Sequence, residues 1–327
     1  MEANAAPVIF IHYGPSGFLR QTLRSARVTN PDKRVIFLGD ASNRKLCPPG
    51  VDFAPIERFA VGEDLRRLRK AFVPIIGSAH RFNKQGGQEY WLRFVFERWF
   101  IILEFLKDEQ IFRFWTFDSD TLIHCRLAAK EAELATYDAT EQCCGRCLNG
   151  YISSRDVVES YTEKMIRLFQ SPDYLDMQRE RLKIHRGLAF NEMDAWQTHR
   201  DQEGLRTLPL GIPRNGEVFD DALAITKGWR VAAQKVRGRI PVKEIAFDED
   251  SSVPYAFPEN ESSPVRLLTM NLSWLPDWLF RRLSPRKLMP DLAMPDKLRP
   301  VSFAEPLRER LVRTILETGW RLRPGRK

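Results

Sequence analysis

Short apolar runs and helix-spaced segments alternate from the start of the chain. Residues 8–11 form a run of β-branched and aromatic residues that ends before Gly14 and Pro15, which predicts a strand buried on both faces. The apolar residues of segment 18–26 have the spacing of one helix face, and residues 34–39 form a second buried run. A strand, a helix and a strand in this order predict a parallel sheet with a right-handed crossover.

Helix and strand patterns continue to residue 271. Residues 89–107 are apolar nearly all round, which predicts a long buried helix, and residues 112–117 predict the next strand. The other expected elements are helices at 62–72, 156–170 and 192–200, a turn at 149–150 that leads into a short strand, a loop at 209–216, and strands at 244–247 and 265–270. The pattern therefore predicts an α/β fold, Rossmann-like, with a mixed, mainly parallel sheet flanked by helices.

Two aspartates stand directly after the strand at 112–117. Asp118 and Asp120 are two residues apart, and in extended backbone their side chains point to the same side. Two carboxylates that close repel each other unless a cation lies between them, and Mg²⁺ or Mn²⁺ prefers such oxygen ligands. The pair therefore predicts a divalent metal that would hold a diphosphate. The alternative is a turn or helix cap, in which the same side chains satisfy backbone donors.

Polar residues also follow the first two strands. His12, Tyr13 and Gly14 end the first strand, and Asp40 ends the second. Because ligands of parallel sheets gather at the carboxyl ends of the strands, we expect these residues to lie at one binding site.

Several of these segments occur in the order found in a known enzyme family. IHYGPSGFLRQTL and NPDKRVIFLGD in 11–40 are followed by FERWFIILEFL in 96–106 and FWTFDSDTLI in 114–123. Further similar segments lie at 149–153, 191–194, 219–221 and 265–270. Over roughly residues 7–275 the chain thus resembles bacterial glycosyltransferases of the GT-A fold.

The resemblance implies a hexosyltransferase-like enzyme of polysaccharide biosynthesis. Such an enzyme moves a sugar from a nucleotide-sugar donor, here expected to be a UDP-sugar, to a saccharide or lipid-linked acceptor. It implies Asp118 and Asp120 as ligands of Mn²⁺ or Mg²⁺, with Arg93 or Arg98 paired to a phosphate or carboxylate near the donor. The residues expected to contact the nucleotide sugar are Ile11, His12, Tyr13, Gly14, Asp40, Arg93, Asp118 and Ser119.

The resemblance also implies a catalytic base and a third metal ligand. Asp194, or Glu192 two residues before it, would take the proton of the acceptor hydroxyl in an inverting mechanism. Many enzymes of this fold place a metal-binding histidine after a late strand, but here Asn271 follows the strand at 265–270. Either Asn271 offers its carbonyl oxygen to the metal, or water and phosphate complete the shell.

The five cysteines predict reduced thiols. Cys144 and Cys147 form a single C-x-x-C pair, and His124 and Cys125 lie upstream of it. These residue types could bind zinc, but the sequence has no second pair at the spacing of a zinc finger. We therefore favour free thiols over a zinc site or a thioredoxin-like redox site.

The net charge of +8 belongs to the end of the chain. Residues 264–327 contain fourteen Lys and Arg against six Asp and Glu, whereas residues 1–263 hold 37 of each. WLPDWLFRRL at 274–283, and a segment that opens with a capping box at Ser302 and Glu305, predict basic amphipathic helices. We divide the chain into a GT-A-like domain at 1–273 and a basic tail at 274–327. The tail would attach to an anionic membrane surface, unless its helices pack on the domain.

The sequence contains no apolar run of the length that spans a membrane and no signal-peptide pattern before the first strand. We expect a cytoplasmic protein that becomes peripheral on the inner face of the plasma membrane if the tail binds lipid. Two other functions remain open: a catalytically silent relative that only binds nucleotide, and a basic nucleic-acid-binding protein. The neutral body and the lack of a known nucleic-acid module speak against a nucleic-acid partner.

Overall fold

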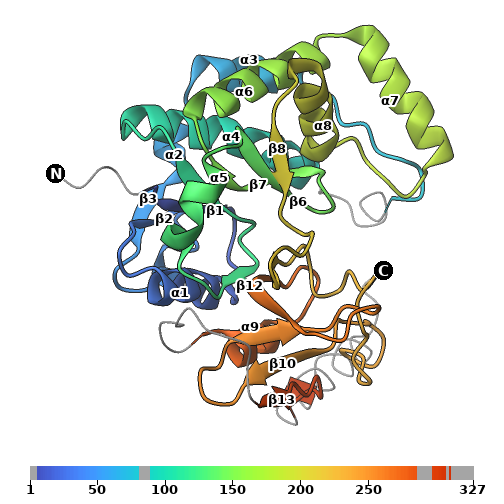
Figure 1. The fold of residues 1–327 in the computed structure, drawn as a ribbon. Helices are drawn as coiled ribbons and strands as arrows, with labels where there is room; N and C mark the ends of the chain where they lie inside the picture. Colours follow the sequence, from blue (N-terminus) through green and yellow to red (C-terminus); the bar gives the residue numbers. More distant parts are fainter. Residues whose placement is uncertain (1–5, 81–88, 286–296, 307–308, 311–327) are drawn as a thin grey trace, which may run out of the picture.

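The structure is a computed structural model that describes residues 6–80, 89–285, 297–306 and 309–310. It contains a large sheet and a small sheet, seen in the upper and lower halves of Figure 1. The chain passes from the large to the small sheet where β4 (Phe114–Thr116) leads into β5 (Thr121–Ile123). Asp118, Ser119 and Asp120 form this connection, which we call the DSD link.

The large sheet has seven strands in the order β3-β2-β1-β4-β7-β6-β8. Strands β3, β2, β1 and β4 are parallel and β8 is parallel to β6, whereas β7 runs antiparallel to β4 and β6. The bounds of the other strands are β1 Val8–His12, β2 Val35–Gly39, β3 Asp52–Pro55, β6 Ala139–Gln142, β7 Cys147–Ile152 and β8 Thr207–Pro209. The protein is therefore a mixed α/β protein with a mostly parallel sheet, as the sequence pattern predicts.

Both faces of the central strands are covered. Side chains along β1 alternate between two cores, because successive residues of a strand point to opposite faces: Ile9 and Ile11 lie in one, Val8 and Phe10 in the other. The first core includes residues of α2 (Ile56–Phe59), α3 (Glu63–Ala71), α4 (Glu89–Asp108), α6 (Arg155–Phe169) and α8 (Glu192–Glu203), and the second includes residues of α1 (Leu19–Thr29). This confirms the burial on both faces that the continuous apolar runs predict.

The small sheet has the order β13-β10-β11-β12-β5, with β9 parallel beside β12. Its other strands are β9 Glu217–Phe219, β10 Ile245–Asp248, β11 Pro254–Ala256, β12 Val265–Asn271 and β13 Leu298–Pro300. Strand β12 pairs antiparallel with β5, so that Asn271 lies opposite Thr121. The late strand predicted at 265–270 thus ends beside the DSD link.

The chain after residue 273 packs on the small sheet. Helix α9 (Asp277–Leu283) buries Trp278, Leu279 and Leu283 in the same core as β12 and leaves its two arginines exposed. The apolar residues of α9 are therefore covered by protein, whereas Trp274, which precedes the helix, is 64% exposed. Most of the second expected tail helix lies outside the described residues.

One local prediction is wrong, and the sequence pattern missed several elements. The structure contains a helix, α7 (Pro172–Ile184), that the sequence pattern did not reveal, because its only buried residues are Leu175, Gln178 and Leu182. The turn expected at 149–150 lies instead at 143–146, and residues 149–150 belong to β7. Short helical segments at η1 (Arg44–Leu46), η3 (Leu127–Lys130) and α5 (Glu131–Leu134) were also not predicted.

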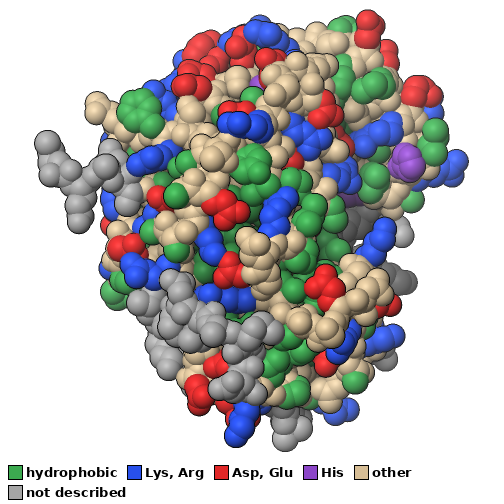
Figure 2. All heavy atoms as spheres, viewed as in Figure 1, with side chains coloured by type: hydrophobic (Ala, Val, Ile, Leu, Met, Phe, Trp, Pro, Cys, Tyr) green, Lys and Arg blue, Asp and Glu red, His purple; other side chains and the backbone are tan. Residues whose placement is uncertain are grey.

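Side chains of both charges are mixed over the visible face of the molecule, and Figure 2 shows no extended surface of one sign there. This agrees with the zero net charge of residues 1–263. Among the helices of the described ranges, none has the length and apolar content needed to cross a membrane.

Candidate functional site

Three parallel strands end at one edge of the large sheet. The register pairs His12 at the end of β1 with Gly39 at the end of β2, and β4 runs parallel on the other side of β1. The DSD link therefore begins beside the end of β1. Side chains from α4 and from the first turn of α8 reach the same edge, as the contacts below show.

Arg98 on α4 connects the DSD link to α8. Its Nη1 donates to Asp118 Oδ1 at 2.8 Å, and its Nη2 donates to Glu192 Oε1 at 3.2 Å. Arg93, the alternative to Arg98 for this pairing and one of the residues expected at the nucleotide sugar, instead pairs with Glu97, with 2.9 Å between Nε and Oε1. The structure thus brings Arg98, and not Arg93, to the aspartates.

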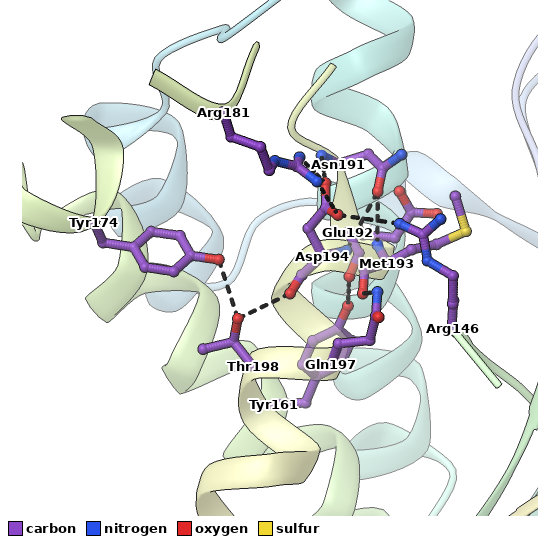
Figure 3. A network of polar contacts seen from close by, with 10 residues as sticks. All are labelled: Arg146, Tyr161, Tyr174, Arg181, Asn191, Glu192, Met193, Asp194, Gln197 and Thr198. Carbon is purple, nitrogen blue, oxygen red and sulfur yellow. Dashed lines mark hydrogen bonds and ion pairs between the residues drawn. The ribbon is translucent and has the colours of Figure 1, made fainter. Parts of the chain in front are cut away.

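Glu192 is the buried acid of this site. It is the first residue of α8, and 7% of its surface is exposed. Burial raises the pKa of the Glu192 carboxyl to about 7; Arg98 opposes this shift and Asp118 adds to it. The Tyr161 hydroxyl donates to the Glu192 carbonyl at 2.6 Å and holds the start of α8 in place (Figure 3). A carboxyl group with this pKa can exchange a proton near neutral pH.

Asp194, the other candidate base, is saturated with hydrogen bonds. Arg181 donates to its two oxygens at 3.0 and 2.8 Å, and Arg146 donates to Oδ1 at 3.3 Å (Figure 3). The backbone N–H of Asn191 donates to Oδ2, completing a capping box. A carboxylate offers about four lone-pair positions, and here all are engaged. The geometry therefore favours Glu192 over Asp194 as a proton acceptor.

Asp120 lies in a polar niche at the end of β12. Ser273 Oγ donates to its Oδ2 at 2.7 Å, and Asn271 Nδ2 donates to its Oδ1 at 3.2 Å. Burial and the nearby charge of Asp118 raise the pKa of Asp120 to about 6. The DSD link is a turn, with the Thr121 N–H donating to Asp118 O at 3.0 Å, so the extended backbone assumed in the sequence argument is wrong, although the charge of Asp118 still acts on Asp120.

Asn271 does not present its carbonyl oxygen to the aspartates. Its Oδ1 accepts from the backbone N–H of Ser273 at 2.9 Å, and its Nδ2 faces Asp120 and the Thr121 hydroxyl. In this arrangement the Asn271 side chain orients Asp120. The expectation that its carbonyl oxygen would bind the metal therefore has no support. Ser273, which the sequence analysis did not identify, gives no signal beyond its position two residues after Asn271.

His12 holds the middle of the DSD link. Its Nδ1 lies 2.8 Å from Ser119 Oγ, and its Nε2 lies 3.0 Å from Ser16 Oγ. Burial lowers the pKa of His12 to about 4, although Asp40 opposes this shift, so the imidazole is neutral at physiological pH. His12 and Ser119, both expected at the same binding site, are therefore in direct contact with each other.

Asp40 shapes the loops at the ends of β1 and β2. It accepts hydrogen bonds from the backbone N–H groups of Gly14 and Asn43 and from both the N–H and the hydroxyl of Ser42. Burial alone would raise the pKa of Asp40, but these hydrogen bonds hold it below its ordinary value. The expected contact between Asp40 and a nucleobase would have to compete with them.

Tyr13 is an exposed residue at the edge of the large sheet where β1, β2 and β4 end. The residue is 49% exposed, and its ring lies 4.6 Å from the ring of Tyr90 and 5.8 Å from that of Phe94, measured between centroids. Ile11, in contrast, is buried in the core, and its side chain cannot contact a ligand. Tyr13 remains available for stacking, whereas a contact to Ile11 would have to involve its backbone.

The residues considered for zinc do not converge. His124 and Cys125 follow β5, whereas Cys144 and Cys147 lie at the turn between β6 and β7. The described part of the chain holds no group of three or more His, Cys, Asp or Glu side chains suited to a metal ion. All five cysteines are free thiols in the structure, which agrees with the preferred interpretation of the sequence.

Comparison with known proteins does not assign the chain to a family. No protein-family model matches it, and no match was found among curated proteins. The functional assignment therefore depends on the site itself.

Proposed function

We propose that the chain is a metal-dependent glycosyltransferase of the GT-A type. It would transfer a sugar from a nucleotide-sugar donor to a hydroxyl group of a saccharide or lipid-linked acceptor. The observation that carries the proposal is the position of Arg98, which holds both the strand-end carboxylate Asp118 and the buried carboxyl group of Glu192. In the proposed inverting mechanism, Asp118 would serve the donor side and Glu192 the proton of the acceptor hydroxyl.

The DSD link suits Mn²⁺ or Mg²⁺. Asp118 and Asp120 supply carboxylate oxygens, and a divalent cation would relieve the repulsion that contributes to the raised pKa of Asp120. Mg²⁺ in proteins is commonly held by one or two carboxylates together with water and phosphate oxygens. Asp118 and Asp120 would therefore hold the cation, and when bound it would neutralise the negative charge of the departing diphosphate.

Glu192 is the group that we assign to proton transfer. At its pKa of about 7, a large share of the carboxyl groups is ionised at neutral pH. The carboxylate would accept the proton of the acceptor hydroxyl as the hydroxyl oxygen attacks the anomeric carbon. Arg98 fixes the orientation of this carboxylate through its hydrogen bond to Oε1.

Thermal-shift measurements with UDP, GDP, CMP and dTDP, each with and without Mn²⁺, test the donor side. We expect UDP to raise the melting temperature only when Mn²⁺ is present. A ligand at a hundred times its dissociation constant stabilises the folded state by about 2.7 kcal/mol. Release of UDP from a UDP-sugar then distinguishes an active enzyme from a silent relative. Absence of any metal-dependent shift with all four nucleotides would contradict the proposal.

Two arginines of α4 provide a matched pair of variants. Arg98→Gln removes the partner of both acids, so we expect turnover to fall by on the order of 10²-fold, as for loss of a well-positioned catalytic group. Arg93→Gln removes an arginine from the same helix that pairs with Glu97 and lies over the Tyr90 ring, and is not the arginine bound to Asp118 and Glu192. We expect it to leave turnover nearly unchanged, and equal losses in the two variants would refute the role of Arg98.

A further inference from the structure

The turn between β6 and β7 places an arginine beside the first turn of α8. Arg146 Nη2 donates to Asp194 Oδ1, and Figure 3 shows the Arg146 side chain directed toward the residues that begin this helix. Glu192, the proposed proton acceptor, is the first residue of α8. Arg146 is therefore held within one helical turn of the group that would receive the acceptor's proton.

The guanidinium group of Arg146 is only weakly engaged. It has five N–H groups, and charged pairs of this kind are commonly about 2.7–2.9 Å long. The contact with Asp194 is longer, at 3.3 Å, and 46% of the Arg146 side chain is exposed. Within the part of the chain that the structure describes, this guanidinium has no other partner. Most of its donors are therefore free for a ligand.

Two arginines share the carboxylate of Asp194. Arg181 donates to both of its oxygens, at 3.0 and 2.8 Å, and so balances its single negative charge. Arg146 is a second cation at the same carboxylate, and Glu192 in this helical turn has its own partner in Arg98. One positive charge therefore remains uncompensated around Asp194. A partly exposed site with such a charge attracts an anion.

The turn that carries Arg146 is fixed by the surrounding fold. Cys144 has a φ angle of +59°, in a region that is uncommon for residues other than glycine. Its N–H donates to Asp221 Oδ2 at 2.7 Å, and Arg200 of α8 donates to Gly145 O at 2.9 Å. A costly backbone conformation persists only where the neighbouring structure holds it. The backbone beneath Arg146 is thus preorganised, which reduces the entropy lost when a ligand binds.

We propose that Arg146 and Arg181 form a binding site for an oxyanion of the acceptor, a phosphate or carboxylate group close to the hydroxyl that receives the sugar. Planar guanidinium groups match both kinds of oxyanion with paired hydrogen bonds. A neutral saccharide offers no charge to Arg146, so the site would favour a phosphate-bearing acceptor or an acidic sugar. That the anion belongs to the acceptor depends on the proposed function, whereas the binding of an oxyanion at these arginines does not.

Chemical protection of the full chain tests the site. Phenylglyoxal modifies arginine side chains, and peptide mapping gives the rate at each position. At constant ionic strength, we expect sulfate or acetate to slow the modification of Arg146 several-fold relative to chloride. Arg179, an exposed arginine of α7 that pairs with Asp176, is the control and should react equally fast in the three salts. Protection by sulfate would indicate a phosphate group and protection by acetate a carboxylate. Protection by neither, or equal protection of Arg179, would overturn the proposal.

Arg146→Gln separates anion binding from folding. Asp194 keeps both hydrogen bonds from Arg181 in this variant, so the melting temperature without added anion should be nearly unchanged. Thermal-shift titration with the protecting anion should give a dissociation constant raised by about tenfold, as for loss of a charge-assisted hydrogen bond. Arg179→Gln should bind the anion as the natural chain does. Undiminished binding in Arg146→Gln would contradict the proposal.

Samples with Mn²⁺ and UDP distinguish the acceptor side from the donor side. Protection of Arg146 by sulfate or acetate should persist in them, because Asp118 and Asp120 would hold the metal and the diphosphate elsewhere in the site. Loss of the protection when UDP is bound would assign Arg146 to the donor and overturn the inference. If UDP with Mn²⁺ fails to bind, the proposed function fails, while the protection measured without nucleotide still decides whether the oxyanion site exists.

Discussion

A single guanidinium group arranges the acids at the candidate site. Arg98 donates to both Asp118 and Glu192, so the ionisation of either acid changes the charge seen by the other. Which arginine takes this position depends on how α4 is rotated about its axis. The sequence places Arg93 and Arg98 on one apolar helix but does not show which of them faces the sheet edge. The orientation of the Asn271 amide is equally invisible in the sequence, because Ser273 determines it.

Glu192→Gln should alter the dependence of stability on pH. The pKa of Glu192 is raised in the folded state, so its contribution to stability is present below about pH 4.5 and is lost as the pH rises through about 7. Gln does not titrate, so the variant should gain stability relative to the natural chain between about pH 5 and about pH 8, by on the order of 2 kcal/mol. Urea unfolding of the metal-free proteins measures this difference. A constant difference across this range would show that Glu192 is not the buried titrating group.

Asp120→Asn should separate metal binding from folding. Because the pKa of the Asp120 carboxyl is raised in the folded state, its ionised form at about pH 8 lowers the stability of the fold. Asn at this position does not ionise, so the metal-free variant should be more stable at about pH 8 than the natural chain. The same change removes a ligand, so the stabilisation by UDP with Mn²⁺ should disappear. Asp118→Asn should lose the same stabilisation. Metal-dependent nucleotide binding that survives in both variants would exclude the DSD link as the metal site.

At the scale of elements, α7 combines two buried leucines, Leu175 and Leu182, with polar contacts to α8. Tyr174 Oη lies 3.1 Å from Thr198 Oγ1, and Arg181 donates twice to Asp194 (Figure 3). The central strands and the helices with broad apolar faces are predictable from sequence, because their burial pattern marks them, whereas the short strands β3, β6 and β8 were not predicted. Helix α7 has few buried apolar residues, so its sequence carries little of that signal. Its position depends on pairings with α8 that only the folded chain brings together.

Arg181→Gln should loosen α7 selectively. It leaves Asp194 with only two long hydrogen bonds, from Arg146 and from the backbone N–H of Asn191, so we expect a loss of on the order of 2 kcal/mol in the free energy of unfolding. Arg179→Gln on the same helix removes only an exposed pair with Asp176, and we expect a change of less than about 1 kcal/mol. Hydrogen exchange in residues 172–184 should be faster in the first variant only. Similar exchange in both variants would mean that Asp194 does not hold α7.

At the scale of the whole molecule, the two sheets have different roles in the site. The large sheet supplies the strand ends and helices that carry Arg98 and Glu192, and the small sheet supplies Asn271 and Ser273. The excess of basic residues lies in 264–327, and part of that segment, α9, is an integral element of the small-sheet core. A membrane contact of the tail would therefore use its charges rather than the apolar face of α9.

Anionic vesicles test this electrostatic attachment. The full chain should float with vesicles that contain phosphatidylserine at low ionic strength and dissociate at high salt, because the attraction is screened. Each Lys or Arg near such a surface contributes about 1 kcal/mol. A variant with Arg321, Arg323, Arg326 and Lys327 all changed to Gln should therefore bind much more weakly. If the natural chain does not float, or this variant floats equally well, the tail does not attach the protein to membranes.

The connection between the two sheets also has a consequence for biosynthesis. Asp120 depends on Asn271 and Ser273, which lie 151 and 153 residues further along the chain. Closing so long a loop is entropically costly and slow compared with local pairing. During translation, the first strands and helices can therefore assemble while Asp120 still lacks its partners. The hydrogen bonds to Asp120 can form only after β12 and the residues that follow it have left the ribosome. A nascent or truncated chain would therefore contain both aspartates but lack the two partners that position Asp120.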